Sequence, residues 1–424
     1  MPTAEILSQG DEVVTGQIAD TNAAWLSEQL TGLGFDVTRH TTVGDRLADL
    51  VGMFDEVASR CDLAVGTGGL GPTEDDLTAQ AMADCAGAPL VLDPEALQQI
   101  QDRYAKAGRT MPEVNRKQAW LPEGALRLDN QWGTAPGFAL KHRRAWMVFL
   151  PGVPREMRGM FPSVVLPLLN REFHVSPGRL VTLRTTGIGE SNLQERVSGV
   201  SPGAAVMGFR TSMPENHVKL RFPTEAPADA VAATVTAMAQ AIGSPLFAID
   251  GVSDVPFALD GPDLQGGGLS QVVGRALTDR GATLAIAESC TGGGVASRCA
   301  SVPGASGWLI EAVVSYANAS KVRRLGVDPA QIAAHGAVSE PVARQMAEGI
   351  RSRAETTFGL ATTGIAGPGG GSAEKPVGTV HMALATPTGT HHRMLRFSGN
   401  RSRVQSLASA AVLDLLRRHL QGRL

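Results

Sequence analysis

The feature of this chain that most restricts its fold is an alternation of short apolar runs with longer amphipathic stretches, which occurs twice. In the first region we expect strands at Ala4–Leu7, Phe35–Thr41 and Leu63–Gly66, with helices at Thr21–Leu33 and Leu47–Ser59 between them. Alternation of this kind is typical of a parallel, doubly wound α/β sheet. A second alternation runs from Leu269 to a closing helix at Arg401–Leu420. The sequence therefore predicts an α/β protein with two α/β domains.

A different pattern separates the two alternations. Strands are expected at Leu180–Thr186 and His217–Phe222, with an alanine-rich helix at Ala226–Ile242, which indicates a small α+β domain. The stretch 254–268 is rich in proline and glycine and is predicted to be a linker. We therefore expect domains at 1–170, 171–253 and 269–424.

Charge and hydropathy exclude some classes of protein. The chain of 424 residues has 38 basic and 41 acidic side chains, which argues against a dedicated nucleic-acid binder. No apolar run approaches the roughly 20 residues that span a bilayer, and the first residues do not resemble a signal peptide. We expect a cytoplasmic protein that binds neither membranes nor nucleic acid.

The cysteines are Cys61, Cys85, Cys290 and Cys299, and they form no C-x-x-C pair and no cluster with histidine. Linear spacing therefore suggests neither a disulfide framework nor a structural zinc site.

Two glycine loops stand out in the first domain. One is 10–16 (GDEVVTG) and the other is 66–76 (GTGGLGPTEDD), and each follows a predicted strand. Ligands of parallel sheets bind at the carboxyl ends of strands, where glycines let the backbone approach a phosphate. The acids Asp11, Glu12, Asp75 and Asp76 are candidates to hold a divalent cation against a pyrophosphate. Alternatively, the glycines only form tight turns and the acids only cap helices.

Ser289 is a candidate nucleophile in the last domain. It lies in AESCTGGG (287–294), on a predicted strand-to-helix turn where amides of the helix amino terminus would stabilise an oxyanion. No histidine occurs in the glycine-bearing motifs, so Tyr316 and Lys321 are the candidates to take its proton. Alternatively, Tyr316 packs in the core and Lys321 is solvated. Cys290 is a competing nucleophile, because thiolates are intrinsically more nucleophilic.

A third glycine-rich loop, TTGIAGPGGGSAEKPVG (362–378), follows another predicted strand. Such a loop suits a phosphate or a ribose, and Lys375 adds a positive charge to it. The simpler interpretation is a flexible surface loop.

The amino-terminal motifs resemble those of the CinA family. The matching segments are GDEVVTGQIADTNAAWL, GTGGLGPTEDDLT and PGVPREM, and the family's domain resembles the molybdopterin-binding fold. The resemblance implies ADP-ribose pyrophosphatase activity with Mg, Mn or Co. It implies Asp11, Glu12, Asp75 and Asp76 as metal ligands, and Asn22, Gly68 and Gly69 as substrate-binding residues.

The carboxy-terminal motifs AESCTGG, the serine–tyrosine segment that ends in lysine, and TGIAGP…AEKPVGTV resemble the CinA carboxy-terminal domain in the same order. The resemblance implies conversion of nicotinamide mononucleotide to nicotinate mononucleotide and ammonia without a cofactor. It implies Ser289 as nucleophile, assisted by Tyr316, Lys321 and Thr363. The substrate-binding residues expected are Thr291, Gly292, Gly364, Gly367, Lys375 and Arg401; Gln405 stands where the family often has a further arginine.

The resemblance spans nearly the whole chain and implies a bifunctional hydrolase of pyridine-nucleotide salvage that forms a homodimer. Its middle domain has been likened to a KH module. No exposed G-x-x-G loop precedes a helix there, so we expect a connector or dimer element. The alternative from another class is a ligand-binding protein that acts through partners in competence or the DNA-damage response.

Overall fold

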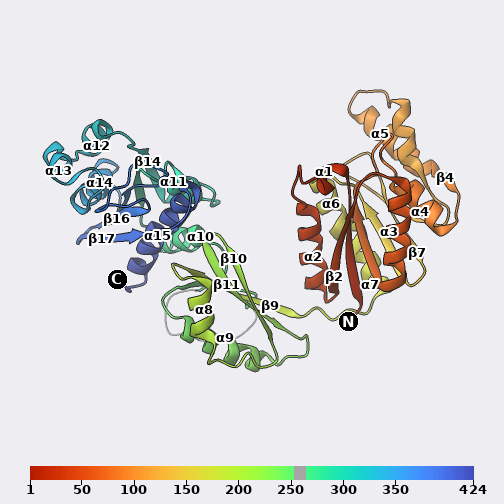
Figure 1. The fold of residues 1–424 in the computed structure, drawn as a ribbon, viewed down its shortest axis with the longest axis horizontal. Coiled ribbons are helices and arrows are strands. Elements are labelled where there is room, and N and C mark those ends of the chain that lie inside the picture. The colour runs from red at the N-terminus through yellow and green to blue at the C-terminus, as the bar shows by residue number, and fades with distance from the viewer. Residues whose placement is uncertain (253–263) are drawn as a thin grey trace. The chain divides into compact units, whose positions relative to one another are not determined.

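The computed structural model describes residues 1–252 and 264–424, and it divides into two compact units (Figure 1). The amino-terminal unit comprises Met1–Gly178 and the carboxy-terminal unit comprises Arg179–Leu424. No helix of the described residues is both long enough and apolar enough to cross a membrane.

The amino-terminal unit is built on a six-stranded sheet of order β2-β1-β3-β8-β7-β6. Its strands are β1 (Thr3–Gln9), β2 (Asp36–Val43), β3 (Leu63–Thr67), β6 (Leu126–Leu128), β7 (Gly137–His142) and β8 (Ala145–Leu150). The first three strands and β8 are parallel, as expected, whereas β6 and β7 are antiparallel. Only two residues join β7 to β8, which is too short for a crossover and forces a hairpin.

Helices cover both faces of this sheet, as the alternation predicts (Figure 1). Leu26 and Leu30 of α2 (Thr21–Leu33) share one core with Ile6, whereas Leu50 of α3 (Leu47–Arg60) shares the other with Leu7. Consecutive residues of a strand point to opposite faces, so β1, which is covered on both sides, is buried along nearly its whole length. The remaining elements are α1 (Asp11–Val14), α4 (Thr78–Ala86), β4 (Leu90–Leu92), α5 (Pro94–Lys106), β5 (Trp120–Pro122), α6 (Pro154–Met160) and α7 (Leu166–Glu172).

The amino-terminal unit extends eight residues beyond the predicted boundary at 170. Helix α7 runs on to Glu172, and the ring of Phe173 packs edge-on against Phe35 with centroids 5.1 Å apart. The segment after α7 therefore packs against the core that contains α2 and is part of the amino-terminal unit.

The carboxy-terminal unit begins with a four-stranded antiparallel sheet of order β10-β11-β9-β12, in the α+β region that the sequence predicts. Its elements are β9 (Arg179–Thr186), α8 (Glu190–Val197), β10 (Val206–Ser212), β11 (Glu215–Phe222), α9 (Ala228–Ile242) and β12 (Leu246–Asp250). Arg417, only 1% exposed, donates to the carbonyls of Ser244 (2.9 Å) and Leu246 (3.2 Å). The small sheet and the last helix thus form one packed body.

Most of the predicted linker, residues 254–263, lies outside the described residues. The part that is described is ordered by contacts, since Gln265 bridges Ile249 and Gly268 caps α10.

The last region holds a five-stranded sheet of order β14-β13-β15-β16-β17, with the first three strands parallel. The strands are β13 (Leu284–Glu288), β14 (Leu309–Val314), β15 (Phe358–Gly364), β16 (Thr379–Thr386) and β17 (Gly389–Arg396). Helices α10 (Leu269–Thr278), α11 (Gly294–Ala300) and α15 (Arg401–Leu420) pack on one face. Helices α12 (Asn318–Leu325), α13 (Pro329–His335) and α14 (Glu340–Arg353) complete the domain, with α12 and α14 in the core of the other face.

One expected helix is shorter than predicted. The sequence pattern favours a helix over Pro341–Phe358, but α14 ends at Arg353 and Phe358 already starts β15. Glu355 has a φ of 51°, which reverses the chain between the two elements.

Candidate functional site

The turn that carries Ser289 is fixed by its neighbour Glu288. Strand β13 ends at Glu288, and its fully buried carboxylate accepts hydrogen bonds from the amides of Gly293 (2.9 Å), Val295 (3.2 Å) and Ala296 (2.8 Å). The Ser289 amide donates to the Thr362 carbonyl at 3.0 Å. The carboxylate complements the amino terminus of α11. The expected use of that terminus for an oxyanion must therefore be revised, because Glu288 already binds three of its amides.

Lys321 of α12 is the hydrogen-bond partner of Ser289. Its Nζ lies 3.0 Å from Ser289 Oγ, 2.8 Å from the Ser315 carbonyl and 3.1 Å from the Tyr316 carbonyl. The side chain is only 1% exposed, and no carboxylate forms an ion pair with it among residues 1–252 and 264–424. Burial lowers the pKa of Lys321 below its usual value.

These three contacts can be made by either protonation state of the amine. An ammonium donates to all three oxygens, whereas a neutral amine donates to the two carbonyls and turns its lone pair to the Ser289 hydroxyl. The Ser289 hydroxyl can then donate its proton along this contact. The arrangement therefore suits a serine nucleophile whose general base is lysine.

The side chain of Tyr316 is engaged elsewhere. It is 57% exposed, and its hydroxyl accepts a 2.5 Å hydrogen bond from Arg401, which also donates to the Gly367 carbonyl at 2.9 Å. Of the two predicted proton acceptors, the structure thus brings Lys321 into contact with Ser289. Arg401, at the start of α15, lies against Tyr316 and the third glycine loop.

Cys290 is poorly suited to be the nucleophile. Its side chain is 4% exposed in the core beneath α15, and burial raises the pKa of its thiol to about 12. The thiol is therefore protonated at neutral pH, and protonated thiols are weak nucleophiles.

The remaining predicted residues of this domain divide between the two faces of the sheet. Thr363 donates to the Ala337 carbonyl at 2.8 Å, whereas the buried Thr291 hydroxyl lies 2.7 Å from Thr362 Oγ1 on the opposite face. Lys375 donates to the His335 carbonyl at 2.6 Å.

Glycine is required in the third loop for packing reasons. A Cβ at Gly364 would lie 2.7 Å from the Thr379 carbonyl oxygen, and Gly367 has a φ of 85°. In the serine turn Gly292 has a φ of 63°, and Gln405 donates to the Cys290 carbonyl at 2.9 Å. These glycines shape the loops whether or not a ligand is bound.

Sequence reasoning missed His381, which pairs with Thr363 across β15 and β16. Its Nδ1 lies 3.0 Å from Nε2 of His392, and burial lowers the pKa of His381 to about 4. Histidines spread along the chain give no linear signal, so only the strand register reveals this neutral pair beside Thr363.

The amino-terminal unit contains a cavity of about 520 Å³ at the carboxyl ends of its strands. It is lined by both predicted glycine loops, which reach the same edge of the sheet as expected. Gly68 and Gly69 have φ values of 104° and 63°, and a Cβ on either would collide with Gln9. Asn22 donates to the Gly152 carbonyl at 2.8 Å, and its buried Oδ1 has no partner among the described residues.

The acids of this cavity differ in part from the predicted set. Glu12, Asp75 and Asp76 line it, together with three acids that sequence reasoning missed, Asp20, Asp45 and Glu156. Asp11 does not line it, because its carboxylate accepts from the Asp45 amide at 3.2 Å while the Asp11 amide donates to Asp45 at 3.0 Å. Asp45 follows β2 at the same sheet edge, which is the signal that could have identified it.

Comparisons with known proteins agree with both regions. Residues 267–420 match the CinA C-terminal domain, and residues 5–171 match a probable molybdopterin binding domain. A CinA-like protein from Shewanella sp. (strain ANA-3) is 41% identical over 99% of this chain and 96% of its own. The nicotinamide-nucleotide amidohydrolase PncC of Shewanella oneidensis is 40% identical over 98% of this chain and 95% of its own.

Among solved structures, the competence/damage inducible protein CihA from Agrobacterium tumefaciens is 37% identical, with a TM-score of 0.35. That match covers 37% of this chain and 98% of the solved one. The two domain matches lie in the order that the motifs predict, and the full-length relatives are 40–41% identical. The chain therefore belongs to the CinA family.

Proposed function

We propose that the carboxy-terminal unit hydrolyses the amide of nicotinamide mononucleotide, releasing nicotinate mononucleotide and ammonia. The observation that carries this proposal is the 3.0 Å contact between Ser289 Oγ and Lys321 Nζ in a buried site. The name of the amidohydrolase from Shewanella oneidensis, 40% identical over nearly the whole chain, supports an amide of a nicotinamide nucleotide as substrate.

In the proposed reaction, neutral Lys321 accepts the Ser289 proton while Oγ attacks the amide carbon. The tetrahedral intermediate collapses as Lys321 returns that proton to the departing nitrogen, and ammonia leaves. Lys321 is then neutral again and accepts a proton from water, whose oxygen attacks the acyl-serine ester. Collapse of the second intermediate returns the proton from Lys321 to Ser289 and releases the nicotinic acid, whose remaining proton passes through solvent to ammonia. Lys321 thus carries the proton of each serine step.

Recognition of the nucleotide is assigned to the cations at the third glycine loop. Arg401 is bound to neutral oxygens, those of Gly367 and Tyr316, and Lys375 is bound to the His335 carbonyl. A phosphate is a stronger acceptor than a carbonyl or a phenol, so we propose that Arg401 exchanges one of these contacts for the substrate phosphate.

The test is ammonia release from nicotinamide mononucleotide by the purified chain, with Ser289→Ala and the matched control Ser301→Ala. We expect Ser289→Ala to lose about 10⁴-fold or more of the rate, since nucleophile removal in hydrolases has effects of that order. Ser301 is exposed, so its variant should retain the rate. Undiminished release by Ser289→Ala would reject the serine, and silence of the folded wild type would reject the activity.

A second candidate function belongs to the amino-terminal cavity, namely metal-dependent hydrolysis of a pyrophosphate such as ADP-ribose. The supporting observation is a 520 Å³ cavity in which two glycine loops meet several carboxylates. Carboxylate oxygens suit Mg²⁺ or Mn²⁺, so Glu12, Asp75 and Asp76 with Asp20 and Asp45 are proposed to hold the ion. When bound, such an ion neutralises phosphate charge. The glycine-loop backbone would orient the phosphates, and the homodimer stays a prediction.

A further inference from the structure

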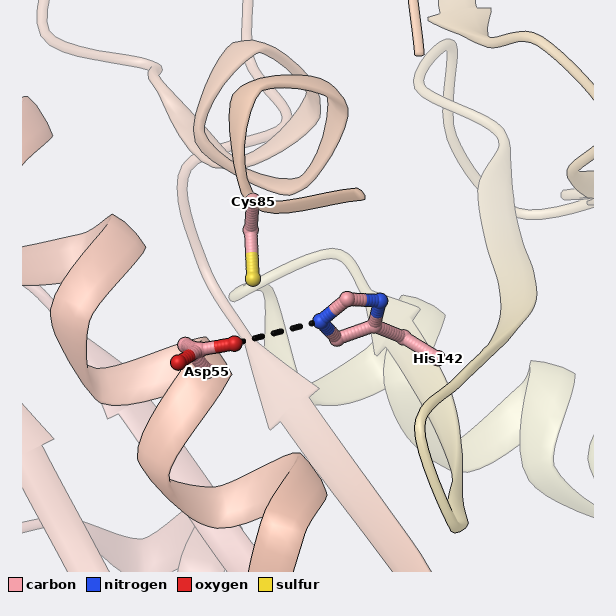
Figure 2. A group of neighbouring side chains, drawn as sticks. All are labelled: Asp55, Cys85 and His142. Carbon is pink, nitrogen blue, oxygen red and sulfur yellow. Dashed lines mark hydrogen bonds and ion pairs between the residues drawn. The ribbon is translucent and has the colours of Figure 1, made fainter. Parts of the chain in front are cut away.

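Three side chains that could ligate a metal meet on the amino-terminal unit (Figure 2). They are Asp55 of α3, Cys85 near the end of α4 and His142 at the end of β7. Their ligand atoms all lie within 4.8 Å of one another, and each residue is partly buried. In the described parts of the chain this is the one such group of three or more His, Cys, Asp or Glu side chains.

The spacing of these atoms is close to that of a zinc site. Bonds of about 2.0–2.3 Å in a tetrahedron place ligand atoms roughly 3.3–3.8 Å apart. Asp55 Oδ1 and His142 Nε2 are already 3.4 Å apart, and the sulfur of Cys85 points toward both (Figure 2). The sulfur has at most about 1 Å to close, because no separation exceeds 4.8 Å.

The cluster is independent of the proposed pyrophosphate site. None of its three residues lines the cavity, and α4 separates the two places. The helix begins at Thr78, whose hydroxyl bonds Gln9 and Gly68 beside the cavity, whereas Cys85 lies near its other end.

The neighbouring residue Arg143 has two opposing effects on metal binding. The guanidinium of Arg143 lies 2.6 Å from the Asp55 carboxylate. It orients that carboxylate, as partners of metal ligands commonly do, but its charge also weakens the attraction for a cation. Binding must also displace a thiol proton, since burial raises the pKa of Cys85 to about 11. A metal that bonds strongly to sulfur can offset both of these costs.

We propose that Asp55, Cys85 and His142 bind a zinc-like divalent ion, with water as its fourth ligand. Sulfur and imidazole nitrogen are poor ligands for Mg²⁺ and good ones for Zn²⁺ and Co²⁺. The ion would join α3, α4 and the β7–β8 hairpin, three elements that the chain brings together from distant positions. Linear spacing gave no sign of it, because no two of the ligands are close in sequence.

The test is titration of the metal-free, full-length protein with Co²⁺, read by absorption. We expect a thiolate-to-cobalt charge-transfer band that saturates near one equivalent. Carboxylates in the cavity can bind Co²⁺ as well, but they cannot give that band, so the readout distinguishes the two places. Cys85→Ser should remove the band. His142→Gln should weaken binding at least about tenfold, an effect of the order seen when the surroundings of a metal site are altered.

The matched controls are His40→Gln and Asp49→Asn, which change exposed residues of the same unit. Both should keep the band and its midpoint. Absence of the band in the wild type, or its persistence in folded Cys85→Ser, would overturn the proposal. If Cys85→Ser does not fold, an unchanged midpoint in His142→Gln would overturn it as well.

Discussion

The two candidate sites of this chain manage charge in opposite ways. The amino-terminal cavity is lined by several carboxylates, and Asp75 is exposed to solvent there. The carboxy-terminal site instead buries one lysine without an acidic partner among the residues described. An open acidic cavity needs a cation to approach a phosphate, whereas a buried, unpaired amine is already prepared to take a proton. Under the proposed functions, the first site would take its positive charge from a bound ion, whereas the second would supply its own base.

Removal of divalent metal should separate the activities of the two sites most completely. We expect a chelator to abolish pyrophosphate hydrolysis and to leave ammonia release within about twofold, because the cavity carboxylates are open to a cation whereas Glu288 beside Ser289 is bound to three amides. The measurement is both rates in one preparation, before and after chelation and after Mg²⁺ is restored. Asp75→Ala should weaken the first rate alone. Pyrophosphate hydrolysis that persists in chelator would contradict the metal role.

Replacement of Lys321 tests the carboxy-terminal site. Lys321→Met keeps the apolar stem and removes the amine, so ammonia release should fall by about 10³-fold, the order of a general-base contribution. The exposed Lys106→Met is the control. Pyrophosphate hydrolysis should not change, and an equal loss of both activities would point to misfolding.

The pH profile of ammonia release tests whether Lys321 is the general base. Burial lowers the pKa of Lys321, and the base must be neutral to accept a proton. The value of kcat/KM should therefore fall as pH drops through that pKa, and this acid limb should lie below the ordinary lysine value of about 10.4. An acid limb at the ordinary value would show that burial does not tune the lysine.

Glu288→Gln should have a smaller effect, on the position of the turn. The glutamine loses the charge that accepts three amides, so we expect about 2–3 kcal/mol less stability and about tenfold slower ammonia release. Denaturant unfolding and kcat measure the two effects. Glu311→Gln removes only a partly exposed ion pair with Arg353 and should cost less than about 1 kcal/mol. Equal losses in the two variants would contradict the positioning role.

The smallest effect is expected from Cys290→Ala. The thiol faces the core, so ammonia release should stay within about twofold while stability falls by about 1 kcal/mol for the lost packing. Loss of ammonia release from a folded variant would support Cys290 as the nucleophile.

Much of the fold was predictable because helix and strand periods are local. The bounds of α2 and α15 were predicted to the residue, since each helix begins directly after a capping side chain, Asp20 or Asn400. The β7–β8 hairpin was missed because its strands lack a helix between them. The edge strand β17 was missed as well, because its exposed face carries no apolar run.

Site residues were predictable where a reactive side chain and the turn that holds it lie in one short motif. Ser289 follows a strand and precedes glycines, so its turn could be read from the sequence. The roles of Glu288 and Asp45 could not, because they depend on which amides the folded loops present. The group of Asp55, Cys85 and His142 required the packing of three elements, which no local pattern encodes.

The buried Arg417 has a consequence for freestanding versions of the last domain. Its guanidinium binds Asp414 of its own helix and two carbonyls at the start of β12. An excised domain would keep the ion pair but lose both carbonyl partners and uncover apolar side chains beside it. An expression fragment of this protein should therefore begin before β9 rather than at α10.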